Sequence, residues 1–350
     1  MAGSKHPLIF DGHNDLLFAL TEAKPVSVDP FFDDTGKHLD ESKCRTGGFG
    51  GGFFAVYVSS PVDIEEEMKK MEQPAYSLEL PDPVSWEQSA AAAHLQMATL
   101  FQLEKRGGLK LCRDVTDIEN CLKREQLAAI LHFEGAEPID AEFNSLEVYY
   151  QAGLRSVGIV WSRPNLFGHG VPFRFPSDGD TGPGLTELGV ALVKRCNEMG
   201  ILVDVSHLNE AGFWDVARVS DRPIVATHSN AHAICPHARN LTDRQLDAIK
   251  ESDGMVGVNL ALAFLREDGR MVDTGLDTVL RHFDYLIERI GEDRVGFGSD
   301  FDGAKIPGQI GTAAGLPNLR HAMIDHGFGE PLMMKLCSRN WLRLLRQTWL

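Results

Sequence analysis

The sequence lacks any block of positive charge and any long apolar segment. Lysine and arginine total 34 residues against 50 aspartates and glutamates, so the formal net charge is −16. An acidic surface repels nucleic acid phosphates and anionic lipids, and a bilayer-spanning helix needs about 20 consecutive apolar residues. We therefore expect neither a nucleic acid partner nor a membrane partner.

Paired cysteines are lacking too, and we expect no secretory signal. Residues 1–6 run directly into an apolar stretch that is too short for such a signal. Residues 340–346 predict an amphipathic helix docked on the body of the protein, and not a lipid-anchor signal. No C-x-x-C pair occurs, which predicts reduced, mostly buried thiols in a cytoplasmic protein. The six cysteines are Cys44, Cys112, Cys121, Cys196, Cys235 and Cys337.

Short apolar runs alternate with helical patterns along the chain. The runs are rich in Val, Ile, Phe and Ala, which is typical of strands buried on both faces. Eight strands that alternate with helices predict one (β/α)8 barrel. An open, doubly wound sheet is the structural alternative, but it would not bring the first and last strands together. The runs lie at about 8–11, 53–59, 127–134, 155–161, 201–206, 223–228, 254–260 and 294–299.

The helical patterns have recognisable ends. Gly200 follows the pattern over 185–199 as a C-cap, and Thr242 precedes the pattern over 243–251 as an N-cap. Further helices are predicted over 85–105 and 274–290.

Two long loops are expected over the rim of the barrel, at 21–52 and 162–184, within a single domain that spans residues 1–350. The glycine-rich stretch 47–52 ends the first loop. It precedes a strand, whereas a phosphate-binding loop follows a strand and opens a helix. We therefore expect it to form a flexible or tightly turned lead into the second strand.

Side chains of metal-ligand types follow five of the apolar runs. In a parallel barrel the carboxyl ends of all strands meet at one rim, so residues distant in sequence can form one site. Imidazole and carboxylate groups are the usual ligands of zinc in hydrolytic sites. The pattern predicts a metallohydrolase. The residues are His13, Asp15, Glu134, His207, His228 and Asp300.

The composition of this set favours two metal ions. His13 and Asp15 are separated by one residue, so in an extended stretch they point to the same side and can hold one ion. His207 and His228 can hold the second ion, and Glu134 can bridge the two. Two cations lower the pKa of a bridging water, and the resulting hydroxide attacks a polarised carbonyl.

Three other residues carry weaker signals. Asp300, on the last strand, can take a proton from the nucleophile and deliver it to the leaving amine. Asp204 lies inside a strand and can orient a metal ligand. Arg239 fits either a surface arginine or helix-cap partner, or a guanidinium that binds a substrate carboxylate through two hydrogen bonds.

A local zinc site is an alternative for one short segment. His228, His232, Cys235 and His237 lie close together in the sequence. No C-x-x-C motif and no second ligand pair completes such a site. We therefore favour the dispersed ligand set.

Together these residues resemble the membrane dipeptidase (renal dipeptidase) family of metallopeptidases. The resemblance implies an amidohydrolase-like (β/α)8 barrel with two Zn²⁺ ions, the ligand roles given above, and a homodimer. It also implies a dipeptide substrate, including dipeptides with a C-terminal D-residue. Arg239 would bind the substrate carboxylate, and Asp300 would transfer the proton and lie near the free amine of the substrate. The matching stretches are 11–15, 134–135, 204–207, 227–229, 238–240 and 298–303.

One position departs from the family pattern. Members of the family usually carry a histidine after the fourth strand that helps to polarise the substrate carbonyl, and here the aligned residue is Trp161. An indole can donate one hydrogen bond but carries no titratable charge. His169 either folds back to supply the missing catalytic group or only caps its loop. Trp161 is accordingly a candidate substrate contact and His169 a candidate catalytic residue.

Two other functions compete with dipeptide hydrolysis. A related hydrolase on the same barrel could cut another amide, such as a lactam or an N-acyl amino acid, and Trp161 motivates this alternative. A barrel that binds metal for stability without catalysis is the second alternative. The presence of Asp300 and Arg239 argues against it.

Overall fold

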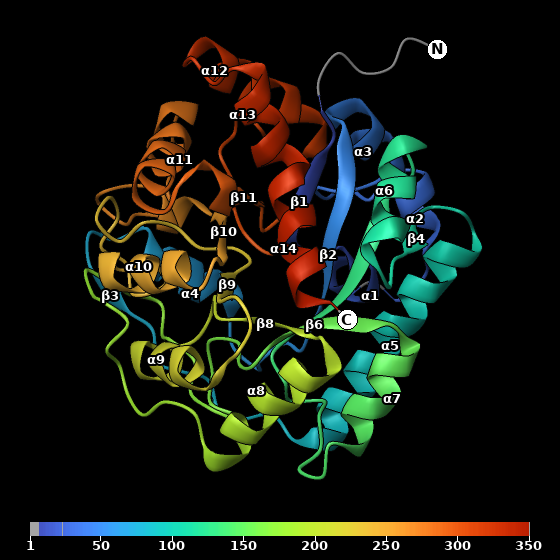
Figure 1. Ribbon diagram of the computed structural model, residues 1–350, viewed down its shortest axis with the longest axis vertical. Coiled ribbons are helices and arrows are strands. Elements are labelled where there is room, and N and C mark those ends of the chain that lie inside the picture. Colours follow the sequence, from blue (N-terminus) through green and yellow to red (C-terminus); the bar gives the residue numbers. More distant parts are fainter. Residues whose placement is uncertain (1–6, 23, 350) are drawn as a thin grey trace.

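Within residues 7–22 and 24–349, which the computed structural model describes, eight parallel strands close into a ring surrounded by helices (Figure 1). The ring closes because β1 pairs with both β2 and β11, and β2 pairs with β5. The predicted (β/α)8 barrel is confirmed, and pairing of the first and last strands excludes an open sheet. In ring order the strands are β1 (Ile9–Asn14), β2 (Phe49–Tyr57), β5 (Ala128–Glu134), β6 (Leu154–Gly158), β8 (Leu202–Asp204), β9 (Val225–Ala226), β10 (Met255–Asn259) and β11 (Val295–Gly298).

The helices form where the sequence places their caps. Ser85 caps α5, Thr242 forms a capping box with Gln245 at the start of α10, and Gly200 ends α8 in the left-handed conformation. The helices are α1 (Leu16–Glu22), α2 (Asp29–Phe32), α3 (Glu41–Gly47), α4 (Ile64–Met71), α5 (Trp86–Lys105), α6 (Val115–Lys123), α7 (Asn144–Ala152), α8 (Glu187–Met199), α9 (Glu210–Val219), α10 (Asp243–Glu251), α11 (Leu276–Ile290), α12 (Leu316–Asp325), α13 (Glu330–Met334) and α14 (Asn340–Thr348). Short 3₁₀ turns lie at Leu262–Phe264, Glu292–Arg294 and Ala313–Gly315, and a π-helical turn lies at Lys335–Arg339.

The interior of the barrel is filled by inward-facing side chains. Successive strand residues point to opposite faces, so Phe10, Phe53 and Ile130 lie inside the ring while the alternate residues pack against the helices. Trp341 of α14 joins the inner cluster, with its ring centroid 5.1 Å from that of Phe53. Its Nε1 donates a hydrogen bond of 3.0 Å to the carbonyl of Phe297. The C-terminal helix therefore helps to fill the barrel core.

The glycine-rich stretch is part of a strand, contrary to the prediction of a lead into it. Residues 50–52 belong to β2, between β1 and β5. A Cβ atom on Gly51 would lie 2.0 Å from the carbonyl oxygen of Ala128, and one on Gly52 would lie 2.2 Å from that of Asp11. Glycine is needed here because the neighbouring backbones approach too closely for a side chain.

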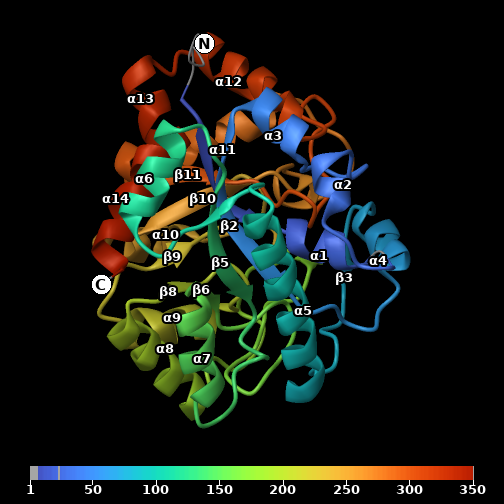
Figure 2. The same cartoon turned by 90° about the vertical axis from the view of Figure 1, so that its right-hand side faces the viewer.

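The predicted loop over 21–52 is also not continuous, because it contains α2, α3 and the start of β2. The predicted loop over 162–184 contains the short strand β7 (Arg174–Phe175). This strand pairs antiparallel with β3 (Tyr76–Ser77), in a segment over 58–85 that the sequence patterns did not single out. Another short strand, β4 (Lys110–Leu111), pairs with the start of β5. In Figure 2, α4 and β3 lie on the side of the strands opposite α14.

No helix within residues 7–22 and 24–349 is long and apolar enough to cross a membrane. All six cysteines are buried and free, as predicted for thiols without a disulfide partner.

Candidate metal centre

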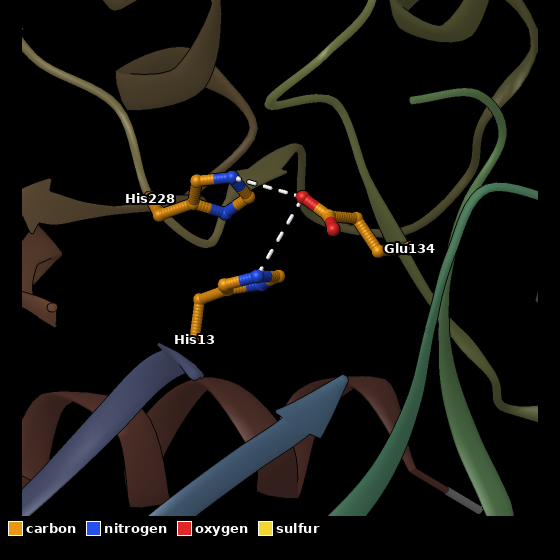
Figure 3. Close-up of side chains that lie close together, drawn as sticks. All are labelled: His13, Glu134 and His228. Atoms are coloured by element: carbon orange, nitrogen blue, oxygen red, sulfur yellow. Dashed lines mark ion pairs between the residues drawn. The ribbon is translucent and has the colours of Figure 1, made fainter. Parts of the chain in front are cut away.

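The five predicted metal ligands converge at the carboxyl end of the barrel. Three imidazoles surround one carboxylate oxygen, Glu134 Oε1. It lies 3.5 Å from Nε2 of His13, 2.9 Å from Nε2 of His207 and 3.5 Å from Nε2 of His228. Figure 3 shows the imidazoles of His13 and His228 directed at this oxygen. All of these side chains are buried, although they come from β1, β5 and the segments that follow β8 and β9.

Asp15 lies on the side of His13, where its Oδ2 is 3.2 Å from Nε2 of that histidine. Ligand atoms of His13, Asp15 and Asp300 all lie within 4.8 Å of one another, as do those of His13, Glu134 and His228. The two groups share His13. The geometry thus offers two adjacent sets of donors.

Hydroxyl groups fix the orientation of two of the imidazoles. Ser162 Oγ lies 2.9 Å from Nδ1 of His207, and Thr227 Oγ1 lies 2.8 Å from Nδ1 of His228. The Thr227 hydroxyl also donates to Asp204 Oδ2 over 2.6 Å. Because the Nδ1 atoms have these partners, the Nε2 atoms face Glu134. Asp204 contacts His228 through Thr227, as a group that orients a ligand would.

Burial and local charge set the protonation of the cluster. Burial, reinforced by the nearby Arg239 guanidinium, holds the pKa values of His207 and His228 well below the usual range. For His13 burial alone would lower the pKa, but the carboxylates of Glu134 and Asp15 outweigh it and raise the value to about 10. Burial raises the pKa of Glu134 well above its usual value. A bound cation would displace the protons that these shifts describe.

The donor set fits divalent metal ions. Neutral imidazole nitrogens and carboxylate oxygens are the ligands that zinc prefers in catalytic sites. Asp15 Oδ1 is buried and has no hydrogen-bond partner among the described residues, although buried carboxylate oxygens are normally paired. A cation between the two donor groups would satisfy it.

Asp300 lies at the edge of the cluster, just beyond the end of β11. Its Oδ2 accepts a hydrogen bond of 2.8 Å from Nδ2 of Asn259. Its φ of 61° is in the left-handed region, which is uncommon for a residue other than glycine. Burial raises the pKa of this carboxyl group. A carboxylate with a raised pKa at a cavity wall suits proton transfer near neutral pH.

Arg239 is buried behind His207, with Nη2 lying 3.2 Å from that residue's Nε2. Its guanidinium donates to the carbonyl oxygens of Ser206 and His228. No carboxylate lies within 4 Å of it among the described residues. Burial lowers its pKa to about 10, so it remains cationic at neutral pH. The reading of Arg239 as a surface arginine is therefore wrong.

A cavity of about 200 Å³ opens beside the cluster. Asp15, Glu134, His207 and Asp300 form its polar floor. Its walls are mainly apolar and include Tyr57, Met68, Trp161, Phe173, Phe264 and Met271. The polar floor and apolar walls suit a small molecule with a polar reacting group.

Trp161 and His169 occupy different places in this site. The Trp161 ring lines the cavity, with its centroid 5.9 Å from that of His207. His169 does not line the cavity in the described part of the chain, and its Nδ1 lies 3.4 Å from the carbonyl oxygen of Gly184. His169 therefore faces the C-terminal end of the loop over 162–184. Of the two readings of His169, its placement fits the loop cap and does not fit a catalytic group.

The alternative local zinc site does not form. His232 Nε2 contacts the carbonyl oxygen of Ser177, and Cys235 Sγ contacts that of Ala263. His237 Nδ1 accepts a hydrogen bond from the backbone N–H of Arg239. Each side chain thus has its own partner.

The sequence patterns did not predict the roles of the polar residues that hold the candidate ligands, among them Ser162, Thr227 and Asn259. Hydroxyl and amide side chains are common in loops, so their types alone carry no signal. Strand alternation could have located one further residue, Tyr57, at the end of β2 on the inner face.

The ring of strands, the ligand cluster at its carboxyl end and the adjoining cavity together define a metal-dependent hydrolase on a (β/α)8 barrel. The model of the membrane dipeptidase family (peptidase family M19) matches residues 4–349, and the chain belongs to this family. The protein is accordingly a dipeptidase of the metallopeptidase type.

Similar proteins support this assignment. A metallopeptidase from Rhodobacter sphaeroides, solved with a phosphinate mimic of the dipeptide L-Ala-D-Ala, is 50% identical with a TM-score of 0.96 and covers 98% of this chain and 100% of its own. Dipeptidase AC, also of family M19, is 50% identical with a TM-score of 0.96 and covers 99% of both chains. A Klebsiella pneumoniae protein from the pqqA 5′ region is 50% identical over 73% of this chain and 95% of its own length.

Proposed function

We propose that the protein is a binuclear zinc dipeptidase that hydrolyses dipeptides, including those with a C-terminal D-residue. The observation that carries the proposal is the convergence of three imidazole Nε2 atoms on Glu134 Oε1 beside a small cavity. The bound L-Ala-D-Ala mimic in the 50% identical Rhodobacter sphaeroides enzyme supports the choice of substrate.

The proposed ligand roles are those that the sequence pattern predicts, and they are supported by the short distances from His13 to Asp15 and from Glu134 to His207 and His228. His13 and Asp15 would hold one ion, His207 and His228 the other, and Glu134 would bridge them through its carboxylate. Such a pair of cations supplies Lewis acidity and an activated water when bound. The chain contributes the fixed orientation of the imidazoles and the exclusion of bulk water by the apolar cavity walls.

Asp300 would move the proton. Its carboxylate, held by the amide of Asn259, takes a proton from the attacking water and gives it to the nitrogen of the leaving amine. The left-handed backbone at Asp300 places the carboxyl group beside Asp15, on the cavity floor.

Arg239 and Trp161 would position the substrate. A buried guanidinium without a carboxylate partner is costly, and the C-terminal carboxylate of a dipeptide would compensate its charge. Trp161 offers an indole ring on the cavity wall against which the dipeptide can pack.

Metal removal tests the proposal. Protein stripped with a chelator should lose dipeptide hydrolysis, because the activated water is lost with the cations, and two equivalents of zinc should restore it. Turnover of L-Ala-D-Ala and bound zinc per chain are the measurements. Full activity of the stripped protein would contradict the proposal.

A substrate series separates this function from its alternatives. C-terminal amidation should lower kcat/KM by at least about 30-fold, because a buried charge left unpaired costs about 2 kcal/mol or more. Hydrolysis of lactams or N-acyl amino acids without hydrolysis of free dipeptides would favour another amidohydrolase activity. Two bound zinc ions with no turnover of any substrate would favour a catalytically silent barrel.

A further inference from the structure

Tyr57 lies at the mouth of the barrel, beside the central carboxylate of the metal centre. It is the last residue of β2, and its Cα is the register partner of Glu134 in β5. The preceding pair, Val56 and Phe133, belongs to the core outside the ring. Because side chains alternate between the faces of a sheet and paired residues share a face, Tyr57 and Glu134 both point inward.

The backbone of Tyr57 is held by Gln96 and its ring packs against two aromatic rings, while its hydroxyl group has no hydrogen-bond partner among the described residues. Gln96 of α5 clamps the backbone, accepting from the Tyr57 N–H over 3.0 Å and donating to its carbonyl oxygen over 2.6 Å. The rings of Phe18 and Trp161 lie 5.1 Å and 5.2 Å away, centroid to centroid. The hydroxyl group has no hydrogen-bond partner among the described residues, and the side chain lines the cavity.

The charges around this hydroxyl group favour a neutral donor. Burial raises the pKa of Tyr57 well above its usual value, while the positive charge of Arg163 partly opposes this. Arg163 is itself buried, donating to Glu137 Oε1 over 2.8 Å and to Ser60 Oγ over 2.7 Å. A protonated O–H donor on an immobilised ring at a cavity wall is the kind of group that stabilises negative charge developing on an oxygen.

We propose that Tyr57 is a catalytic residue whose hydroxyl group donates a hydrogen bond to the carbonyl oxygen of the scissile peptide bond. The bond strengthens as water adds to the carbonyl carbon and negative charge moves onto that oxygen, and the hydroxyl group keeps its proton throughout. The proposal rests on the proposed dipeptidase function. In this proposal the donor to the scissile carbonyl oxygen is Tyr57, and not the indole of Trp161 or the imidazole of His169.

The test is Tyr57→Phe in the full-length, zinc-loaded protein. Loss of one such donor should lower kcat for L-Ala-D-Ala by about 100- to 1000-fold, with KM changed by less than about threefold because ground-state binding is retained. The affinity for the phosphinate mimic of L-Ala-D-Ala should fall by a comparable factor, since the mimic carries the charge of the transition state. The zinc content should stay at the wild-type value.

Tyr149→Phe is the matched control. Its hydroxyl group lies 3.5 Å from Nε2 of His94, and its ring packs against Phe133 outside the barrel. This variant should keep wild-type kcat, zinc content and phosphinate affinity. The same loss in both variants would mean that removal of any buried hydroxyl disturbs the enzyme, and would overturn the assignment.

Other outcomes are equally decisive. A kcat within about threefold of wild type in Tyr57→Phe, or loss of zinc from this variant, overturns the catalytic role while leaving the dipeptidase function intact. A large loss in Trp161→Phe with none in Tyr57→Phe would assign the donor to the indole. Wild-type protein that binds zinc but neither hydrolyses dipeptides nor binds the phosphinate would instead refute the proposed function.

A second measurement covers the case in which Tyr57→Phe does not fold. Replacing Tyr57 by 3-fluorotyrosine keeps the ring and its packing but makes the hydroxyl group more acidic and a stronger donor. Phosphinate affinity should then rise at a pH where the hydroxyl group remains protonated. Unchanged affinity would overturn the proposal.

Discussion

Single hydroxyl groups decide which nitrogen is available to a metal in two of the three imidazoles, those of His207 and His228. The Nδ1 atoms of His207 and His228 face the hydroxyls of Ser162 and Thr227, which leaves both Nε2 atoms directed at Glu134. The lowered pKa values of both histidines keep them neutral, which is the form that binds metal. A serine and a threonine, residue types that are common in loops, thus orient the two imidazoles for metal binding.

At the same scale, Asp300→Asn should separate proton transfer from metal binding. The asparagine keeps an oxygen for the Asn259 amide but cannot accept a proton, so kcat should fall by roughly 100- to 10,000-fold. Steady-state kinetics and zinc content per chain check this, with zinc expected to stay at the wild-type value. Asp325→Asn, at an exposed position near the end of α12, is the control. Wild-type rates for Asp300→Asn would remove Asp300 from the mechanism.

At the scale of elements, α14 does more than cover the surface. Trp341 is fully buried, and a Cβ atom on Gly12 would lie 2.6 Å from its ring, so β1 carries glycine where the indole enters the barrel. The amphipathic pattern over 340–346 predicts a docked helix. It does not reveal that this helix contributes to the barrel core, because the pattern reports only which side of a helix is apolar.

Trp341→Ala should therefore be strongly destabilising. Removing a buried aromatic ring leaves a cavity and should lower the free energy of unfolding by about 3–5 kcal/mol. Urea denaturation followed by circular dichroism measures this. Trp86 of α5 is 45% exposed, and Trp86→Ala should cost clearly less. Equal losses of unfolding free energy in the two variants would show that burial of Trp341 in the barrel core adds no special stability.

The eight ring strands were predictable from the sequence because each is a short run buried on both faces. Their ends were less predictable: β9 spans only Val225–Ala226, and β2 begins at Phe49 within the glycine-rich stretch. Glycine has a low intrinsic strand preference. Here the close approach of β1 and β5 overrides that preference. The segment over 58–85, with α4 and β3, was not singled out from the sequence. The apolar residues Met68 and Met71 of α4 are spaced as on one face of a helix, and they line the cavity.

At the scale of the whole molecule, stability should depend on pH through buried histidines. Burial lowers the pKa of His282 to about 4. Its Nδ1 accepts from the N–H of Ala231 and its Nε2 donates to the carbonyl oxygen of Leu265, an arrangement that requires the neutral ring. The unfolded chain binds a proton near pH 6.5, whereas the folded chain does not. Stability is thus complete above about pH 6.5 and declines as the pH falls toward 4.

The expected loss from His282 alone is on the order of 3 kcal/mol over this range, because each pKa unit corresponds to 1.36 kcal/mol. Urea unfolding of the metal-free protein at pH 7.5, 6, 5 and 4 measures it. His282→Gln should be less stable at pH 7.5 but should lose less on acidification than wild type. Parallel losses in the two proteins would contradict the assignment to His282.

The sequence by itself determined the alternation of strands and helices and the chemical types of the candidate ligands, because periodicity and residue type are local properties. Only the tertiary structure decided which side chains meet. It brought His13 near Asp300 through pairing of the first and last strands, placed Tyr57 beside Glu134 through strand register, and turned His169 away toward Gly184. These outcomes depend on ring closure and loop paths, which arise from contacts between residues far apart in the chain.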